Sequence, residues 1–255
     1  MTEREEQPAV LTEVRDRVLL VTLNRPEARN AINGAVVAGL LDAFALLEDD
    51  DALSVGVLAG AGRGFCSGMD LKAFATEGTP AGGDQLFQNG CRKPLIAAIE
   101  GFAMAGGLEL ALLCDLLVAA EGAKLGIPEV GVGLFAAGGA LVRLPSRLPY
   151  AVAAELALTA DPFTAELAQG FGLVNRVVPV GGAVDEALRL AQRVARNAPL
   201  AIAASKEILR RSTGRTEEEL FEFQKPLIKK VFRSSDAKEG PRSFAEKRAA
   251  RWTAS

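Results

Sequence analysis

The chain has 255 residues, of which 49% are hydrophobic and 24% charged, so it can bury a large core in one large domain or in one domain with a smaller appendage. Its net charge of -3 argues against binding nucleic acid through bulk positive charge. Histidine is absent, which excludes Ser-His-Asp and Cys-His catalysis, and Cys66, Cys91 and Cys114 lack the spacing of metal ligands, so no metal site is expected. Carboxylates are then the leading candidates for proton transfer.

The first half of the chain alternates β-like runs with helical patterns. The run at residues 17–23 (RVLLVTL) predicts a strand that stops at the turn Asn24-Arg25-Pro26. Asn33 is a good N-cap for a helix that the acidic residues 49–51 end. Further strands are predicted at residues 54–59, 94–99 and 116–119. Strands separated by helices in this way indicate right-handed βαβ units and a largely parallel sheet.

The second half is predicted to be helical. Helices are expected after Gly139 at residues 151–159, 164–170, 183–197, 200–211, 217–232 and 236–251. The fold class is therefore α/β, with an α/β core over residues 1–200 and a helical C-terminal region over residues 201–255. Such a helical extension is often used for contacts between subunits.

Two glycine-rich segments share one design, residues 58–71 (LAGAGRGFCSGMDL) and residues 99–110 (IEGFAMAGGLEL). Each leaves a predicted strand, passes through glycines and starts an apolar helical pattern. Glycine allows close approach of the backbone to a ligand, and the first turn of a helix offers unpaired N–H groups. Two such turns facing each other would form an oxyanion hole. Taken singly, each turn is also compatible with an ordinary strand-to-helix connection.

These residues resemble the enoyl-coenzyme A hydratase/isomerase (crotonase) family. The matching pieces are residues 64–72 (GFCSGMDLK), 93–98 (KPLIAA), 105–111 (AGGLELA), Cys114-Asp115 and Pro128-Glu129, and the likeness runs from residues 23–26 (LNRP) to residues 246–248 (EKR). The resemblance implies a crotonase-like spiral of ββα units whose helical C-terminal region forms a homotrimer or a dimer of trimers.

The resemblance also implies a set of site residues. The amides of Met69 and Gly106 match the family's oxyanion hole, and Glu109 and Glu129 match its two catalytic glutamates. Two carboxylates around one water can supply the base and the acid that hydration of a conjugated double bond requires. Without the family motifs, Glu109 would be interpreted as a first-turn glutamate and Glu129 as a solvated loop residue. The presence of both favours hydration.

The substrate implied by the resemblance is an acyl-CoA thioester, which carries coenzyme A with it, so no separate cofactor is expected. The family's Pro-Gly-x-Gly-Gly turn is replaced here by residues 135–139 (FAAGG), which places the matching amide on Ala137. The full set of expected substrate-binding residues is Ala28, Met69, Asp70, Leu71, Lys72, Gly106 and Ala137, with Phe244 and Lys247 contributed by a neighbouring subunit.

Two other functions fit the same residues. One is isomerisation of an enoyl-CoA, or hydration or dehydration of an unusual acyl group, and the other is non-catalytic binding of acyl-CoA. Cys66, beside the first glycine turn, is expected to be a packing residue, and Glu100 a loop residue.

Composition also favours a cytoplasmic protein without a membrane partner. Residues 1–8 are charged and have no apolar centre, so they do not form a signal peptide. The apolar stretch at residues 108–120 is interrupted by Glu109 and Asp115. Three scattered cysteines do not form a disulfide framework, which favours a reducing compartment.

Overall fold

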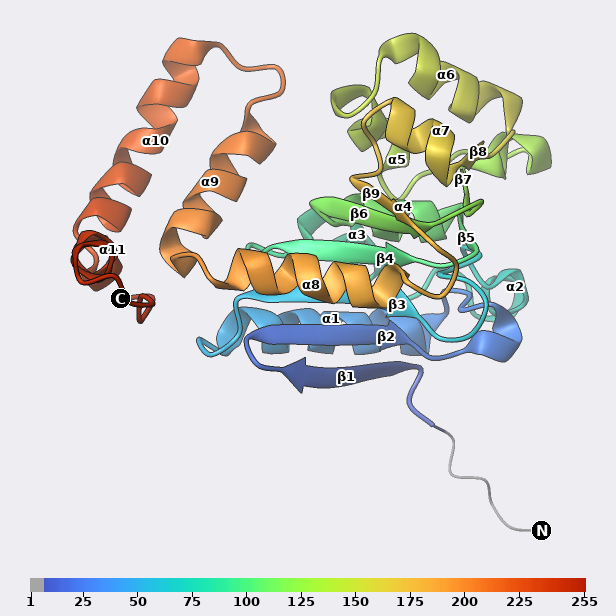
Figure 1. Cartoon of the computed structure of the whole chain (residues 1–255). Helices are drawn as coiled ribbons and strands as arrows, with labels where there is room; N and C mark the ends of the chain where they lie inside the picture. Colours follow the sequence, from blue (N-terminus) through green and yellow to red (C-terminus); the bar gives the residue numbers. More distant parts are fainter. Residues whose placement is uncertain (1–6) are drawn as a thin grey trace.

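The computed structural model describes residues 7–255 and is built on a six-stranded sheet with the strand order β1-β2-β3-β4-β6-β9 (Figure 1). Strand β1 is antiparallel to β2, and every other neighbouring pair is parallel. This confirms the predicted parallel sheet, and all four predicted strands are present. The strands are β1 (Val10–Arg15), β2 (Val18–Leu23), β3 (Val55–Gly60), β4 (Leu95–Ile99), β6 (Leu116–Ala120) and β9 (Arg176–Val178).

Helices cover both faces of this sheet, α8 (Ala183–Ala195) on one side and α1 (Gly34–Asp49) with α4 (Gly106–Leu113) on the other (Figure 1). Side chains of a strand point alternately to the two faces. In β2, Val18 and Leu20 therefore join the cluster around α8, and Leu19 and Val21 join the cluster around α1. Because both faces are buried, β2 is a continuous apolar run, as is typical of parallel sheets.

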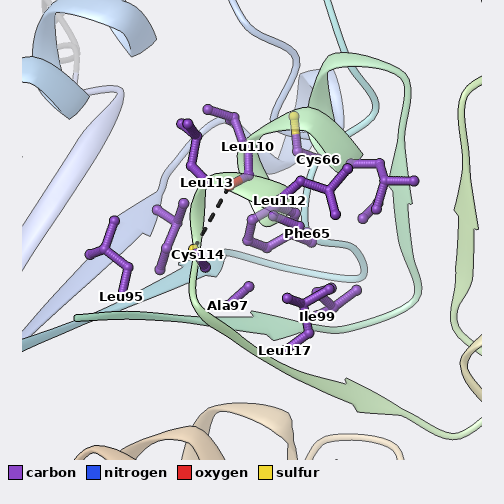
Figure 2. Packing of buried hydrophobic residues seen from close by; sticks show 14 of the residues in the cluster. Phe65, Cys66, Leu95, Ala97, Ile99, Leu110, Leu112, Leu113, Cys114 and Leu117 are labelled. Atoms are coloured by element: carbon purple, nitrogen blue, oxygen red, sulfur yellow. Dashed lines mark hydrogen bonds between the residues drawn. The ribbon is translucent and has the colours of Figure 1, made fainter. Parts of the chain in front are cut away.

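Helix α4 packs on the sheet, and this packing fixes the position of the helix N-terminus. Figure 2 shows Leu112 of α4 beside Phe65, with Ala97 of β4 and Leu117 of β6 below them. Seven of the eight residues of α4 are buried, the exception being Gly106. A helix buried on all sides has no polar face, which explains why its sequence is apolar apart from Glu109.

A second, three-stranded sheet lies at one end of the molecule and consists of β5 (Phe102–Met104), β7 (Lys124–Gly126) and β8 (Phe163–Thr164). A helix is present at each of the six positions predicted after Gly139, but β8 and β9 are strands that no sequence pattern predicts. Both are only two or three residues long, too short to show an alternating pattern in sequence. The helices α5 (Ala140–Arg143), α6 (Tyr150–Thr159) and α7 (Ala165–Gly170) lie in the same part of the molecule (Figure 1).

The C-terminal helices α9 (Pro199–Arg211), α10 (Glu217–Phe232) and α11 (Ser235–Ala245) project from the opposite end (Figure 1). Helix α11 is shorter than the predicted 236–251, because the chain turns at Lys247, whose φ is 51°. The boundary expected at residue 200 lies inside α9, and the division into two domains stays a prediction. The remaining short elements are α2 (Leu71–Glu77), α3 (Gly83–Asn89) and the 3-10 turns η1 (Pro26–Ala28), η2 (Pro128–Val132) and η3 (Leu144–Ser146).

None of the helices within residues 7–255 combines the length and the apolar character needed to cross a membrane. Residues 1–6, most of the segment predicted not to be a signal peptide, lie outside the described residues.

Candidate active site

The two glycine turns predicted from sequence lie against each other. Cys66 and Ala103 form a parallel β-bridge, and the Met104 amide donates to the Cys66 carbonyl at 3.0 Å. A Cβ at Gly107 would come within 2.3 Å of that same carbonyl oxygen, so only glycine lets α4 begin this close to the first turn. The two turns therefore form one unit.

The amides of Met69 and Gly106 lie side by side in this unit. A Cβ at Gly106 would be 3.7 Å from the Met69 nitrogen, and a Cβ at Gly68 would be 3.2 Å from the Gly106 nitrogen. Within residues 7–255, neither amide donates a hydrogen bond. Gly106 occupies the first position of α4, where an N–H group has no partner inside the helix. Two free, adjacent donors are the arrangement that an oxyanion hole requires.

Ala105 sets the direction in which α4 begins. Its φ of 52° and ψ of -129° are unfavourable for a residue with a Cβ, and its amide is held by the Gly126 carbonyl at 2.8 Å. Strained backbone of this kind persists only where the surrounding structure enforces it, and it clusters at functional sites.

Glu109 lies in the first turn of α4 and is only 5% exposed. Its Oε1 accepts a hydrogen bond from the Ala140 amide at 3.1 Å, so the carboxylate contacts a distant segment and does not cap its own helix. Burial raises the pKa of Glu109 above its ordinary value, although the amides of Ala140 and Gly138 and the Arg143 guanidinium act in the opposite direction. A raised pKa makes a carboxyl group a better proton donor than an ordinary glutamate.

Glu129 lies in η2, and its Oε2 is buried without a hydrogen-bond partner among the described residues. Burial raises the pKa of Glu129, and the nearby Glu109 carboxylate raises it further. A solvated loop residue would show neither feature. The structure thus brings Glu109 close enough to Glu129 to raise its pKa, and Oε2 of Glu129 has no partner among the described residues.

The first glycine turn is fixed by residues that sequence reasoning missed. Asn30, 1% exposed, donates to the carbonyls of Ala61 and Gly64, both at 2.9 Å, and accepts from the Arg25 amide. Arg25 forms an ion pair with Asp70 at 3.0 Å. In the sequence, the only signal for Arg25 is its place in the Asn-Arg-Pro turn, and Asn30 has none.

The Asp70 side chain caps the start of α2. Its Oδ1 accepts from the Ala73 amide at 3.2 Å, which caps the helix, and this bond together with Arg25 lowers its pKa. Ala28 lies in η1, and Leu71 and Lys72 form the exposed first turn of α2.

A pocket of about 210 Å³ lies beside Met69 and was also missed from sequence. Its lining comes from the residues before α1, from α2 and from the loop that follows α2, and it includes Ile32, Met69, Ala73, Phe74, Glu77 and Thr79. Segments far apart in sequence contribute to it, so no local pattern could have shown it.

Other predicted site residues do not lie next to the glutamates and the glycine turns within this chain. Phe244 is 85% exposed, and both it and Lys247 lie with the C-terminal helices, far from α2 (Figure 1). Ala137 is exposed just before the turn that faces Glu109. The roles of these three residues stay predictions.

Two residues near the site have the structural roles expected of them. Cys66 is fully buried, and burial raises the pKa of its thiol to about 12, so it is a packing residue. Glu100 accepts hydrogen bonds from the amides of Gly181 and Ala183 at the start of α8.

Comparison with known proteins agrees with this geometry. A sequence profile of the family described as "Enoyl-CoA hydratase/isomerase" matches residues 13–255. The chain is 42% identical to enoyl-CoA hydratase EchA19 of Mycobacterium tuberculosis, with 98% of each chain covered. It is 39% identical to carnitinyl-CoA dehydratase of Proteus mirabilis, with 93% of this chain and 95% of that protein covered.

Solved structures give the same result. The crystal structure of an enoyl-CoA hydratase from Mycobacterium tuberculosis superimposes with a TM-score of 0.92 at 50% identity, covering 98% of this chain and 100% of that one. This confirms the expected crotonase-like fold. The chain belongs to the enoyl-CoA hydratase/isomerase (crotonase) family.

Proposed function

We propose that the chain is an enoyl-CoA hydratase that reversibly adds water to a trans-2-enoyl-CoA and forms a 3-hydroxyacyl-CoA. The observation that carries the proposal is a pair of desolvated carboxyl groups: Glu109 is buried, and half-buried Glu129 has its Oε2 buried without a hydrogen-bond partner among the described residues. Burial raises the pKa values of both groups. Desolvating two carboxylates without ion-pair partners is costly, and a protein that only bound a thioester would gain nothing from it.

In the proposed reaction, the water oxygen bonds to the β-carbon while one carboxylate accepts the water proton, and the α-carbon gains a proton from a carboxyl group. Negative charge develops on the thioester oxygen, where the amides of Met69 and Gly106 would donate hydrogen bonds. The proposal is supported by the two unpartnered amides, which need no reorganisation to receive this oxygen.

The remaining substrate contacts are part of the same proposal. Coenzyme A enters as part of the substrate, and no other cofactor takes part. Ala28 and residues 70–72 would follow the coenzyme A moiety, with Asp70 contributing its backbone because its side chain already holds Arg25. Ala137 would face the water, and Phe244 and Lys247 would reach the coenzyme from a neighbour in a homotrimer or dimer of trimers. A cytoplasmic location is supported by three free, buried cysteines.

The test uses Glu109→Gln and Glu129→Gln with Glu100→Gln as a matched control. Both site variants should lose hydration of an enoyl thioester, which is measured from the ultraviolet absorbance of the thioester. Both should still bind the thioester in calorimetry. Glu100→Gln should remain active, because Glu100 caps α8. Full activity of either site variant on a substrate that the wild type hydrates would contradict the proposal.

A second candidate is hydration or dehydration of an unusual acyl group, or isomerisation of an enoyl-CoA. It is favoured by the relatives named carnitinyl-CoA dehydratase, which are 39–40% identical to this chain. A turnover screen of enoyl thioesters from short to long chains, with carnitinyl-CoA included, separates these substrates. An isomerase needs only one carboxylate, so its two Gln variants would lose activity very unequally. Tight binding without any turnover would indicate a non-catalytic binder.

A further inference from the structure

The turn that faces Glu109 is held from behind by Arg143, a half-buried residue at the end of α5. Its Nη1 donates to the Gly138 carbonyl at 3.1 Å, and its Nη2 donates to the Phe87 carbonyl in α3. The Arg143 amide also donates to the Gly139 carbonyl at 3.0 Å. The guanidinium lies against Gly139, since a Cβ there would be 2.0 Å from Nη1. Arg143 therefore encloses the turn and ties it to α3.

The opposite side of the same turn contacts the Glu109 carboxylate. The Ala140 amide donates to Oε1 at 3.1 Å, and a Cβ at Gly138 would be 2.6 Å from Oε2. In a trans peptide the C=O and N–H groups point in opposite directions. With the Gly138 carbonyl held by Arg143, the Gly139 N–H is directed to the Glu109 side.

From this arrangement we propose that Arg143 is a positioning residue, which keeps the amides of residues 138–140 aimed at the Glu109 carboxylate. The inference rests on the proposed catalytic role of Glu109. The turn has Phe135 where the family motif has proline, so it lacks the φ restriction that a proline ring would supply. The bridge from Arg143 to two carbonyls supplies that rigidity, which a planar guanidinium does better than an ammonium group.

The charges around this cluster determine how it responds to pH. Glu109 faces the Arg143 guanidinium, which lowers its pKa, and it neighbours the Glu129 carboxylate. Burial lowers the pKa of Arg143, and Arg210 of α9 and nearby Arg147 act in the same direction. Replacing Arg143 by a neutral residue removes a cation that lowers the pKa of Glu109, so this pKa then rises.

The experiment compares Arg143→Gln and Arg143→Lys with Arg147→Gln as a matched control. Arg147 is a half-buried arginine four residues away, but it donates to the carbonyls of Leu112 and Cys114 at the far end of α4. We expect Arg143→Gln to lower kcat for hydration by about tenfold to a hundredfold with little change in KM, because small displacements of a catalytic group have effects of this size. The kinetic pKa that belongs to Glu109 should move to higher pH.

Arg143→Lys keeps the charge but reaches only one carbonyl, so kcat should fall less and the pH profile should stay in place. Arg147→Gln should lose stability without a change in the pH profile. Wild-type kcat and pH profile in folded Arg143→Gln would overturn the inference. If that variant does not fold, an equal loss of kcat in Arg143→Lys and Arg147→Lys would overturn it.

The variants Glu109→Gln and Glu129→Gln keep the two proposals distinguishable. If both abolish hydration while the Arg143 variants behave as wild type, only the positioning role fails. If neither abolishes it, the proposed function fails first.

Discussion

Gly138 lies close to the Glu109 carboxylate because glycine has no side chain. Gly138 does not have a positive φ, so alanine is compatible with its backbone, but the added Cβ would lie 2.6 Å from Oε2 of Glu109. Either the carboxylate or the turn must then move. Sequence comparison with the family motif alone does not show this contact.

We therefore predict that Gly138→Ala lowers kcat for hydration by about a hundredfold, as expected for displacement of a catalytic group by roughly 1 Å. Gly170→Ala is the control, because nothing lies within 4 Å of a Cβ there and its φ is also ordinary. Steady-state kinetics of the two variants are the measurement. Equal, near wild-type activity of both would show that the site tolerates the shift.

The raised pKa of Glu109 also makes the stability of the protein depend on pH. The folded state holds this proton more tightly than the unfolded chain, so the stability linked to Glu109 is full below the ordinary glutamate pKa of about 4.3. It is lost as the pH rises through the folded pKa. A buried carboxylate thus lowers the stability of the fold at neutral pH, which is a common cost of a functional site.

Glu109→Gln should accordingly melt at about the wild-type temperature near pH 4 and at a higher temperature at pH 8, as measured by thermal unfolding across this range. Glu48→Gln should instead melt at a lower temperature than the wild type at pH 8. Burial raises the pKa of Glu48, but the amides of Lys93 and Arg92 and the Arg92 side chain outweigh it, so the net pKa is lowered and the carboxylate stabilises the fold. A Glu109→Gln variant that is less stable than the wild type at pH 8 would contradict this account.

Among the elements, α9 is attached to the sheet by an ion pair between a buried lysine and a half-buried aspartate. Lys206, 8% exposed, donates to Asp115 Oδ2 at 2.6 Å and to the Lys93 carbonyl at 2.9 Å. The same Asp115 oxygen accepts from the Leu95 amide at 2.8 Å. One lysine thus connects the first C-terminal helix with the segments that begin β4 and β6.

Lys206→Met should lower the free energy of unfolding by about 2 kcal/mol, because it removes a charge-assisted hydrogen bond and leaves the half-buried Asp115 carboxylate without its partner. Lys225→Met is the control: it breaks the exposed pair with Glu222 and should change stability by no more than about 0.5 kcal/mol. Urea titration of both variants measures the difference. Equal losses would mean that α9 is held by its apolar contacts alone.

At the scale of the whole molecule, the C-terminal helices leave large apolar side chains in solvent. The exposed residues on or next to these helices are Leu209, Phe221, Ile228, Phe232 and Phe244. Exposed apolar surface of this kind is typical of subunit interfaces. It agrees with the proposal that this region forms trimers.

Light scattering should therefore give a mass of three or six times the 26.7 kDa of one chain. Phe232→Ser should shift the mass towards the monomer, because it removes an exposed apolar group from this surface. Val180→Ser is the control, since Val180 is equally exposed but lies before α8. A wild-type monomer would contradict the proposal and would also remove the basis for assigning Phe244 and Lys247 to a neighbour's site.

Much of the fold could be predicted because its signals are local. The central strands are continuous apolar runs, and Asn33 caps α1 by accepting from the Val36 amide, as its side chain allows. Local signals failed where partners are distant or elements are short. Strands β5, β7, β8 and β9 have only two or three residues each, so their pairing depends on the rest of the fold.

The amino-acid sequence was enough to recognise the family and to exclude histidine chemistry, because motifs in a fixed order and the absence of histidine are properties of the chain alone. The environment of the candidate groups follows from the tertiary structure. Segments that are distant in sequence bury Glu109 and surround the unpartnered oxygen of Glu129. The hydrogen bond from Arg143 to the 138–140 turn also exists only in the folded chain. Desolvation and hydrogen bonding depend on those three-dimensional neighbours, and they set the pKa values on which the proposed reaction depends.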